Sequence, residues 1–110
     1  MARRSEAIDP GSGSVFRDLG FDQPEEHRVR ARLAMRINEL LAERGWTQAR
    51  AAALLEISQP HISDLKRYRL GRFSSERLLH FLTRLDQDVE IVIRPKPARR
   101  RMGELTVSAS

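Results

Sequence analysis

The polar side chains between Ser58 and Arg67 have types and spacing that suit hydrogen-bond chemistry. Around two apolar residues, Ile62 and Leu65, this segment carries an amide, an imidazole, a hydroxyl, a carboxylate and a guanidinium. Such groups donate to and accept from base edges in the DNA major groove, which is wide enough to admit an α-helix. The segment therefore predicts a helix that reads duplex DNA with its exposed face.

The chemistry of each side chain suggests its role. Gln59 is the best candidate base reader, because an amide bonds bidentately to adenine N6 and N7. Arg67 suits guanine, whereas Asp64 either accepts from cytosine N4 or holds Arg67 through an i,i+3 pair. The candidate base contacts are Gln59, Pro60, His61, Ser63, Asp64 and Arg67. The candidate phosphate contacts are Gln48, Ser58, Lys66, Arg69 and Arg72. Gln48 and Ser58 have a purely structural alternative, since both can cap helix ends.

Two short helices joined by a tight turn must position these groups. Thr47 is suited to cap the first helix and Ser58 the second. The residues from Gln48 to Leu55 are good helix formers, and Pro60 falls in the first turn of the next helix, where its missing N–H costs nothing. The residues expected to face inward are Ala52, Leu55, Ile57, Ile62 and Leu65.

Two amphipathic helices are expected on either side of this pair. The first follows a capping-box spacing at Asp22 and Glu25 and ends near Arg44, with Gly45 as a left-handed terminator. The second follows a cap at Ser74 and ends around residues 85–87. Their apolar residues recur at helical spacing: Val29, Leu33, Ile37, Leu40 and Leu41 in the first, and Leu78, Leu79, Phe81, Leu82 and Leu85 in the second.

This pattern resembles a known family. The residues Trp46-Thr47-Gln48-Ala49 and Ala52, then Ile57-Ser58-Gln59, Ile62-Ser63 and Leu65, resemble the Cro/phage-repressor-like (XRE) helix-turn-helix family. The run from Phe73 to Leu85, followed by residues 88–93, is similar to the HigA-like antitoxin branch. The resemblance covers roughly residues 15–94. It implies a mainly α, four- to five-helix, lambda-repressor-like domain with Gln59 at a base-reading position. One departure is Glu56, at a turn where the family often has glycine.

Residues 88–94 alternate with a period of two, which predicts a single C-terminal β-strand with Val89, Ile91 and Ile93 on one side. A lone strand leaves a row of unpaired backbone groups and therefore needs a partner. We expect the same strand of a second copy, in a homodimer. The alternative is an internal hairpin with Glu104 to Val107.

Three regions follow from these patterns. Residues 1–14 are expected to be disordered, residues 15–94 to form the DNA-binding domain with its dimerisation strand, and residues 95–110 to form a basic tail. The tail is either a solvated end or a source of phosphate attraction at low salt. A small apolar cluster begins the domain, and it either packs on the helices or docks a protein partner: Val15, Phe16, Leu19 and Phe21.

The composition is compatible with a nucleic-acid partner. The chain has 110 residues, a formal net charge of +5 and no cysteine. A small basic domain points to an anionic partner. We expect no cofactor, no metal and no enzymatic activity, because the three histidines fall on separate elements and no glycine-rich phosphate loop is present. Without an apolar run of about 20 residues or a signal core, the chain is expected in the cytoplasm, associated with the nucleoid and not with a membrane.

The functional expectation is a sequence-specific repressor that binds a palindromic operator in double-stranded DNA as a homodimer. The family resemblance adds an antitoxin role with a RelE/HigB-like toxin as possible partner. The alternatives are a stand-alone XRE-type repressor without a toxin and a purely protein-binding antitoxin.

Overall fold

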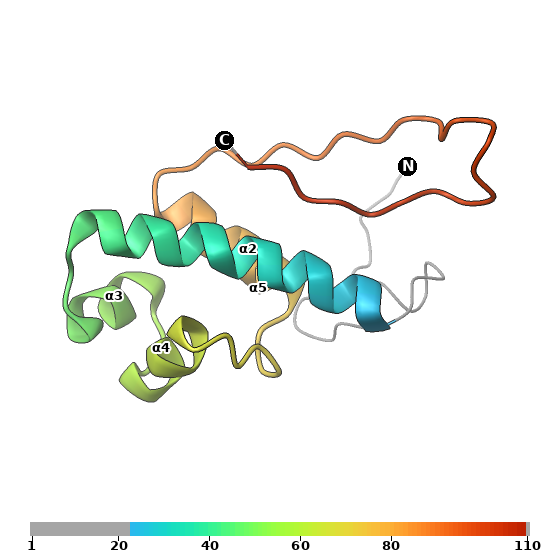
Figure 1. The fold of residues 1–110 in the computed structure, drawn as a ribbon. Coiled ribbons are helices and arrows are strands. Elements are labelled where there is room, and N and C mark those ends of the chain that lie inside the picture. Colours follow the sequence, from blue (N-terminus) through green and yellow to red (C-terminus); the bar gives the residue numbers. More distant parts are fainter. Residues whose placement is uncertain (1–22, 110) are drawn as a thin grey trace.

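The computed structural model describes residues 23–109, and within this range it has four helices. They are α2 (Gln23–Arg44), α3 (Gln48–Leu55), α4 (Gln59–Lys66) and α5 (Ser75–Arg84). The long helix α2 packs against α5, while α3 and α4 pack against each other on one side of α2 (Figure 1). The expectations for residues 1–14, for Asp22 and for the apolar cluster at residues 15–21 lie outside the described residues.

The predicted caps are confirmed at all three short helices. The hydroxyl oxygen of Thr47 accepts from the N–H of Arg50 at 3.1 Å, and that of Ser58 accepts from the N–H of His61 at 3.3 Å. Ser74 begins α5 in the same way. Each such cap stabilises its helix by about 1 kcal/mol. These caps determine where the α3–α4 pair begins and therefore which residues of α4 face outward.

The turn between α3 and α4 is made by Glu56 in the left-handed conformation, with φ of 60°. The N–H of Glu56 donates to the carbonyl of Ala53 at 3.3 Å, and the N–H of Ile57 donates to that of Ala52 at 3.0 Å. This is the Schellman arrangement, in which a left-handed residue closes the helix. The turn thus forms without glycine, and the Glu56 carboxylate pairs with Arg84 of α5 at 3.2 Å.

The core lies between α2, α5 and the α3–α4 pair. Phe73 is fully buried there and meets Phe81 edge-on with ring centroids 5.9 Å apart. The expected inward positions Ala52, Leu55, Ile62 and Leu65 are buried, while Ile57 is partly buried against them. The Asn38 side chain of α2 donates to the carbonyl of Leu65 at 3.2 Å, which ties α4 to the long helix.

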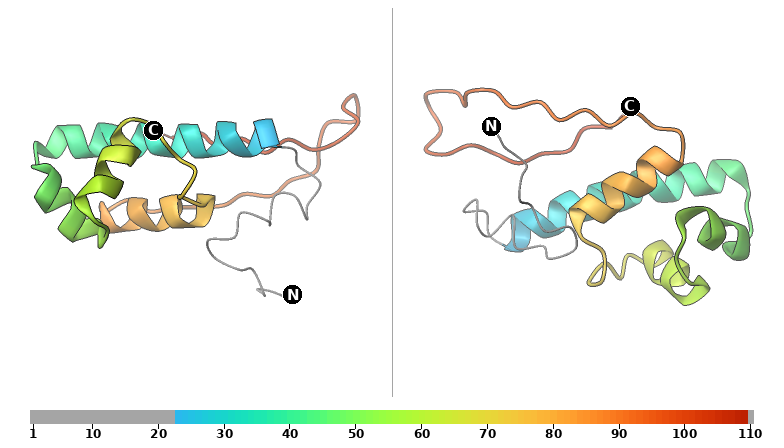
Figure 2. Two further views of the ribbon diagram at one scale, coloured as in Figure 1. Left: turned by 90° about the horizontal axis from the view of Figure 1, so that it is seen from below. Right: turned by 180° about the vertical axis from the view of Figure 1, so that it is seen from behind.

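Residues 88–109, here called the arm, leave the end of α5, run out and return along α2 on the side away from α3 and α4 (Figures 1 and 2). The prediction of a β-strand at residues 88–94 is wrong for the single chain, where this segment is extended without strand pairing. The backbone of residues 88–96 makes no hydrogen bond within the described part of the chain.

The internal hairpin with residues 104–107 does not form either. Leu105 and Val107 pack against the helical core, and the N–H of Leu105 donates to the Glu25 carboxylate of α2 at 2.9 Å. The returning half of the arm is therefore bonded to α2 and not to residues 88–94.

Candidate nucleic-acid interface

The outer face of α4 projects from the body of the molecule (Figure 1). Ile62 and Leu65 are fully buried and anchor the helix from beneath. The six predicted base-contacting residues share the remaining surface, and we call them the recognition face: Gln59, Pro60, His61, Ser63, Asp64 and Arg67. Gln59, Pro60 and Arg67 are exposed, and the other three are half-buried. Five of the six thus lie on α4, and Arg67 is the residue that follows its last turn.

The candidate phosphate contacts lie at the ends of α3 and α4. Gln48 is the exposed first residue of α3, and since Thr47 supplies the cap, the Gln48 amide is not needed for that purpose. The Ser58 hydroxyl accepts the capping bond of α4, and its own hydrogen is still available to a phosphate. Lys66 and Arg69 are exposed, and their side chains have no hydrogen-bond or ion-pair partner in residues 23–109.

The pair between Asp64 and Arg67, one of the two alternatives for Asp64, does not form. The Asp64 carboxylate instead accepts from Nε of Arg72 at 3.3 Å. The reason is the chain path after α4, because Tyr68 adopts φ of 62° and turns the loop back toward the helix. Arg72 therefore lies beside the recognition face and is the partner of Asp64 that the i,i+3 spacing offered as Arg67.

Arg50 is a candidate contact that the sequence reasoning missed. Its guanidinium lies 5.0 Å from the centre of the Trp46 ring, and Arg44 lies over the same ring at 5.0 Å. Arg44 also donates to the carbonyl of Leu85 at 2.9 Å, whereas the Arg50 guanidinium makes no hydrogen bond within the described chain. Stacking on an indole orients a guanidinium while leaving its N–H groups free. The i,i+4 spacing of Trp46 and Arg50 is the feature of the sequence that could have predicted this stacking.

The basic residues of the arm are not part of this surface. The arm lies across α2 from α3 and α4 in the views of Figures 1 and 2. Arg100 is paired with Glu104 at 3.4 Å. The phosphate attraction considered for the run Arg99–Arg101 is therefore directed away from the recognition face.

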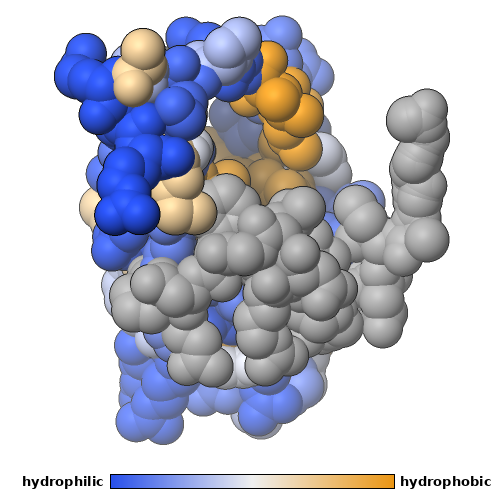
Figure 3. Space-filling model, turned by 90° about the vertical axis from the view of Figure 1, so that its right-hand side faces the viewer, coloured by the Kyte–Doolittle hydropathy of each residue, from blue (hydrophilic) through white to orange (hydrophobic). Residues whose placement is uncertain are grey.

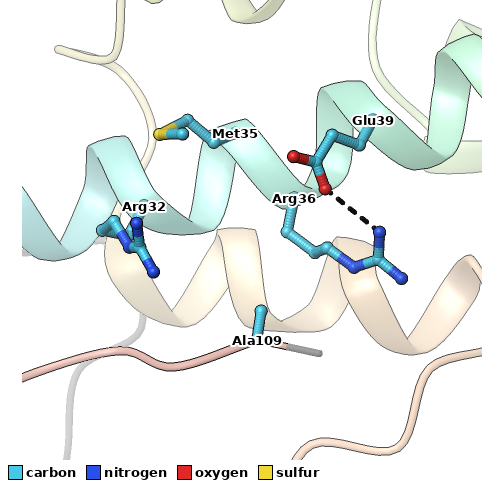
Figure 4. Close-up of a pocket in the computed structure, with 5 residues that line it drawn as sticks. All are labelled: Arg32, Met35, Arg36, Glu39 and Ala109. Carbon is cyan, nitrogen blue, oxygen red and sulfur yellow. Dashed lines mark hydrogen bonds and ion pairs between the residues drawn. The ribbon is translucent and has the colours of Figure 1, made fainter.

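A shallow pocket of about 90 Å³ lies where the end of the arm meets α2 (Figure 4). It is lined by Arg32, Met35, Arg36, Glu39 and Ala109. Arg36 and Glu39 pair with each other along α2 at 3.1 Å, which leaves Arg32 as the remaining charge of the lining. Among residues 23–109, no group of His, Cys, Asp and Glu is placed to hold a metal ion. None of the helices described is long and apolar enough to cross a membrane.

Comparisons with known proteins agree with this geometry. A family model described as a helix-turn-helix domain matches residues 15–94. One solved structure, named as an XRE family transcriptional regulator, is 45% identical in sequence and superposes with a TM-score of 0.77. That match covers 81% of this chain and 100% of the other. No curated protein matches the chain.

Proposed function

The chain belongs to the XRE helix-turn-helix family of transcriptional regulators, and from this premise we propose that it is a repressor that binds one DNA sequence specifically. The proposal places it in the cytoplasm, at the nucleoid. The observation that carries it is the recognition face, on which six polar or small side chains project from a helix whose opposite side is buried. Docking α4 in a major groove brings the two phosphate strands toward the ends of α3 and α4, where Gln48, Arg50, Lys66 and Arg69 lie.

The test is selection of binding sites from random duplexes, followed by a footprint on the DNA upstream of the chain's own gene. The expected result is one enriched motif that also occurs in the protected region. Equal binding to all duplexes, at every salt concentration tried, contradicts the proposal.

We further propose that the repressor acts as a homodimer joined through the arm. Ile91 and Ile93 are 74% and 92% exposed, beside backbone groups that have no hydrogen-bond partner in residues 23–109. Figure 3 looks along the molecule onto the arm and shows hydrophobic atoms open to solvent at its top. Antiparallel pairing with the same segment of a second copy satisfies these backbone groups and covers Val89, Ile91 and Ile93. Two recognition helices about 34 Å apart then match a palindromic operator.

Sedimentation at micromolar concentration tests the dimer. The wild-type chain is expected to have twice the mass of one chain, and Ile91→Asp is expected to be monomeric. Glu90→Ser is the matched control, because it lies next to Ile91 on the opposite side of the alternation. A monomeric wild type rules out the dimer without affecting DNA recognition by α4.

The antitoxin role is a second proposal, and it rests on the sequence resemblance to the HigA-like branch. The segment proposed for toxin contact, residues 15–21, lies outside the described residues. Co-expression with a neighbouring RelE/HigB-like ribonuclease gene provides the test. Co-purification of the two proteins and relief of toxicity are expected, and their absence with every neighbouring gene leaves the stand-alone repressor.

A further inference from the structure

Asp64 is the single acidic residue of α4, and it lies in the middle of the recognition face of a chain whose net charge is +5. A carboxylate on a surface that approaches DNA is repelled by the phosphates. A carboxylate at this position is favourable only if a nearby cation offsets its charge and the DNA offers it a hydrogen-bond donor.

Arg72 supplies the cation. Its Nε lies 3.3 Å from Oδ2 of Asp64, and the two side chains keep exposed fractions of 48% and 25%. The pair is thus accessible from outside, and the second carboxylate oxygen of Asp64 makes no hydrogen bond within residues 23–109.

The loop that carries Arg72 is firmly built. The N–H of Arg69 donates to the backbone carbonyl of Asp64 at 2.8 Å, and the next residue, Phe73, is fully buried. Arg77 donates to the carbonyl of Arg72 at 3.5 Å and stacks over the Phe73 ring at 5.4 Å. Arg72 therefore approaches Asp64 from a fixed backbone position, which restricts the orientations of the carboxylate.

An ionised carboxylate accepts hydrogen bonds and cannot donate them. In the major groove it is repelled by the acceptors of guanine and thymine, and it is satisfied by the amino group of cytosine. Adenine also offers an amino donor, but its N7 acceptor lies beside that donor and repels the carboxylate. We propose that Asp64 reads a cytosine N4 amino group at one position of each half-site, and that Arg72 is a positioning residue that balances and orients the Asp64 carboxylate. This inference rests on the proposed DNA-binding function and names the base that one part of that surface selects.

The competing role for Arg72 is direct contact with a phosphate. The two roles differ in what they predict. Loss of a phosphate contact weakens binding to all sequences equally and reduces the slope of log K against log salt by about 1. A positioning role changes the preference at one base pair and requires Asp64.

The experiment is binding-site selection with the full chain and with Asp64→Asn, Arg72→Gln, Arg72→Lys and the double variant Asp64→Asn/Arg72→Gln. Asp64→Asn is expected to lose at least fivefold of the cytosine preference at one position and to move toward adenine, which an amide reads. Arg72→Gln is expected to reduce the cytosine preference at that same position. The double variant is expected to reduce it no further than Asp64→Asn does alone. Arg72→Lys keeps the charge and is expected to restore part of the preference.

Arg69→Gln is the matched control, since it removes a cation from the same loop whose side chain makes no bond to Asp64 and leaves the backbone bond between the two residues in place. It is expected to weaken all duplexes alike. The proposal is overturned if Asp64→Asn keeps the wild-type preference at every position, or if Arg72→Gln behaves as Arg69→Gln does. If the wild-type chain itself enriches no motif, the proposed function is what has failed. Thermal unfolding of each variant confirms that it is folded, and the lysine variant still tests the inference if the glutamine variant unfolds.

Discussion

At the scale of single residues, the side chains on and beside the recognition face suit different parts of DNA. Gln59 is an exposed amide at the first position of α4, directly after the cap. Because the helix begins at a capped residue, the Gln59 side chain leaves from the end that enters a groove first. Lys66, in the last turn, is a point charge with no partner in residues 23–109, which suits a phosphate and carries no information on base sequence.

Gln59→Ala is expected to cost about 1–3 kcal/mol of binding free energy on the selected site and to relax the preference at one base pair. The lost interaction is a bidentate hydrogen bond, so the loss is sequence-dependent. Titration of the selected duplex and of its single-base variants measures it. Unchanged affinity together with unchanged preference means that α4 is not the recognition helix.

Lys66→Ala is expected to weaken binding to every duplex by a similar factor and to reduce the slope of log K against log salt by about 1. The physical reason is the release of one fewer counterion. Affinities at four salt concentrations measure the slope. A loss confined to one base pair contradicts the assignment of Lys66 to a phosphate.

At the scale of the elements, three helices end at a non-glycine residue in the left-handed conformation. These residues are Glu56, Tyr68 and Asp86, with φ of 60°, 62° and 66°. In each case two backbone N–H groups donate to carbonyls of the last turn, which offsets the strain. Glu56 and Asp86 add ion pairs with Arg84 and Arg44, so the ends of α3 and α5 are held to neighbouring helices by their side chains.

Glu56→Gly is expected to be about 1 kcal/mol more stable than Glu56→Ala, because glycine adopts positive φ without the steric cost of a Cβ atom, and its greater freedom in the unfolded chain removes part of the gain. Both variants lose the pair with Arg84, so their difference reports the relief of backbone strain less the entropy that glycine adds to the unfolded chain. Urea denaturation of the two variants measures it. Equal stabilities show that the turn relaxes away from the left-handed conformation.

At the scale of the whole molecule, the chain has two opposite sides. The recognition face lies with α3 and α4 below α2, and the arm lies above it (Figure 1). The helix α2 lies between them, with Leu33 and Ile37 buried in the core. The proposed DNA-binding surface and the proposed dimer surface therefore do not overlap.

The double variant Arg99→Gln/Arg101→Gln is expected to leave the salt slope of DNA binding unchanged. Both side chains belong to the arm, on the side away from α4, and the pair of Arg100 with Glu104 is left intact. The slope is measured under the conditions used for Lys66→Ala, which serves as the positive control. A slope lowered by about 2 shows that the arm reaches the DNA.

The local features of this protein were determined by the sequence alone. The caps at Thr47, Ser58 and Ser74, the left-handed Gly45 and the buried positions of α3 and α4 depend on residues a few positions apart. Such interactions are made within one or two helical turns, so spacing along the chain is enough to predict them. The family pattern rests on the same short-range spacing.

The tertiary structure alone decided where distant segments meet. The partner of Asp64 is Arg72 because a left-handed Tyr68 reverses the loop. Residues 88–94 have no strand partner within residues 23–109, because Leu105 and Val107 pack on the helices and Leu105 bonds to α2. The alternation of residues 88–94 correctly indicates an extended chain, yet a β-strand is defined by its hydrogen-bonding partner. Sequence periodicity describes a segment and not its neighbour in space, and for this reason the fold of each helix was predictable while the pairing of Asp64 and of the arm was not.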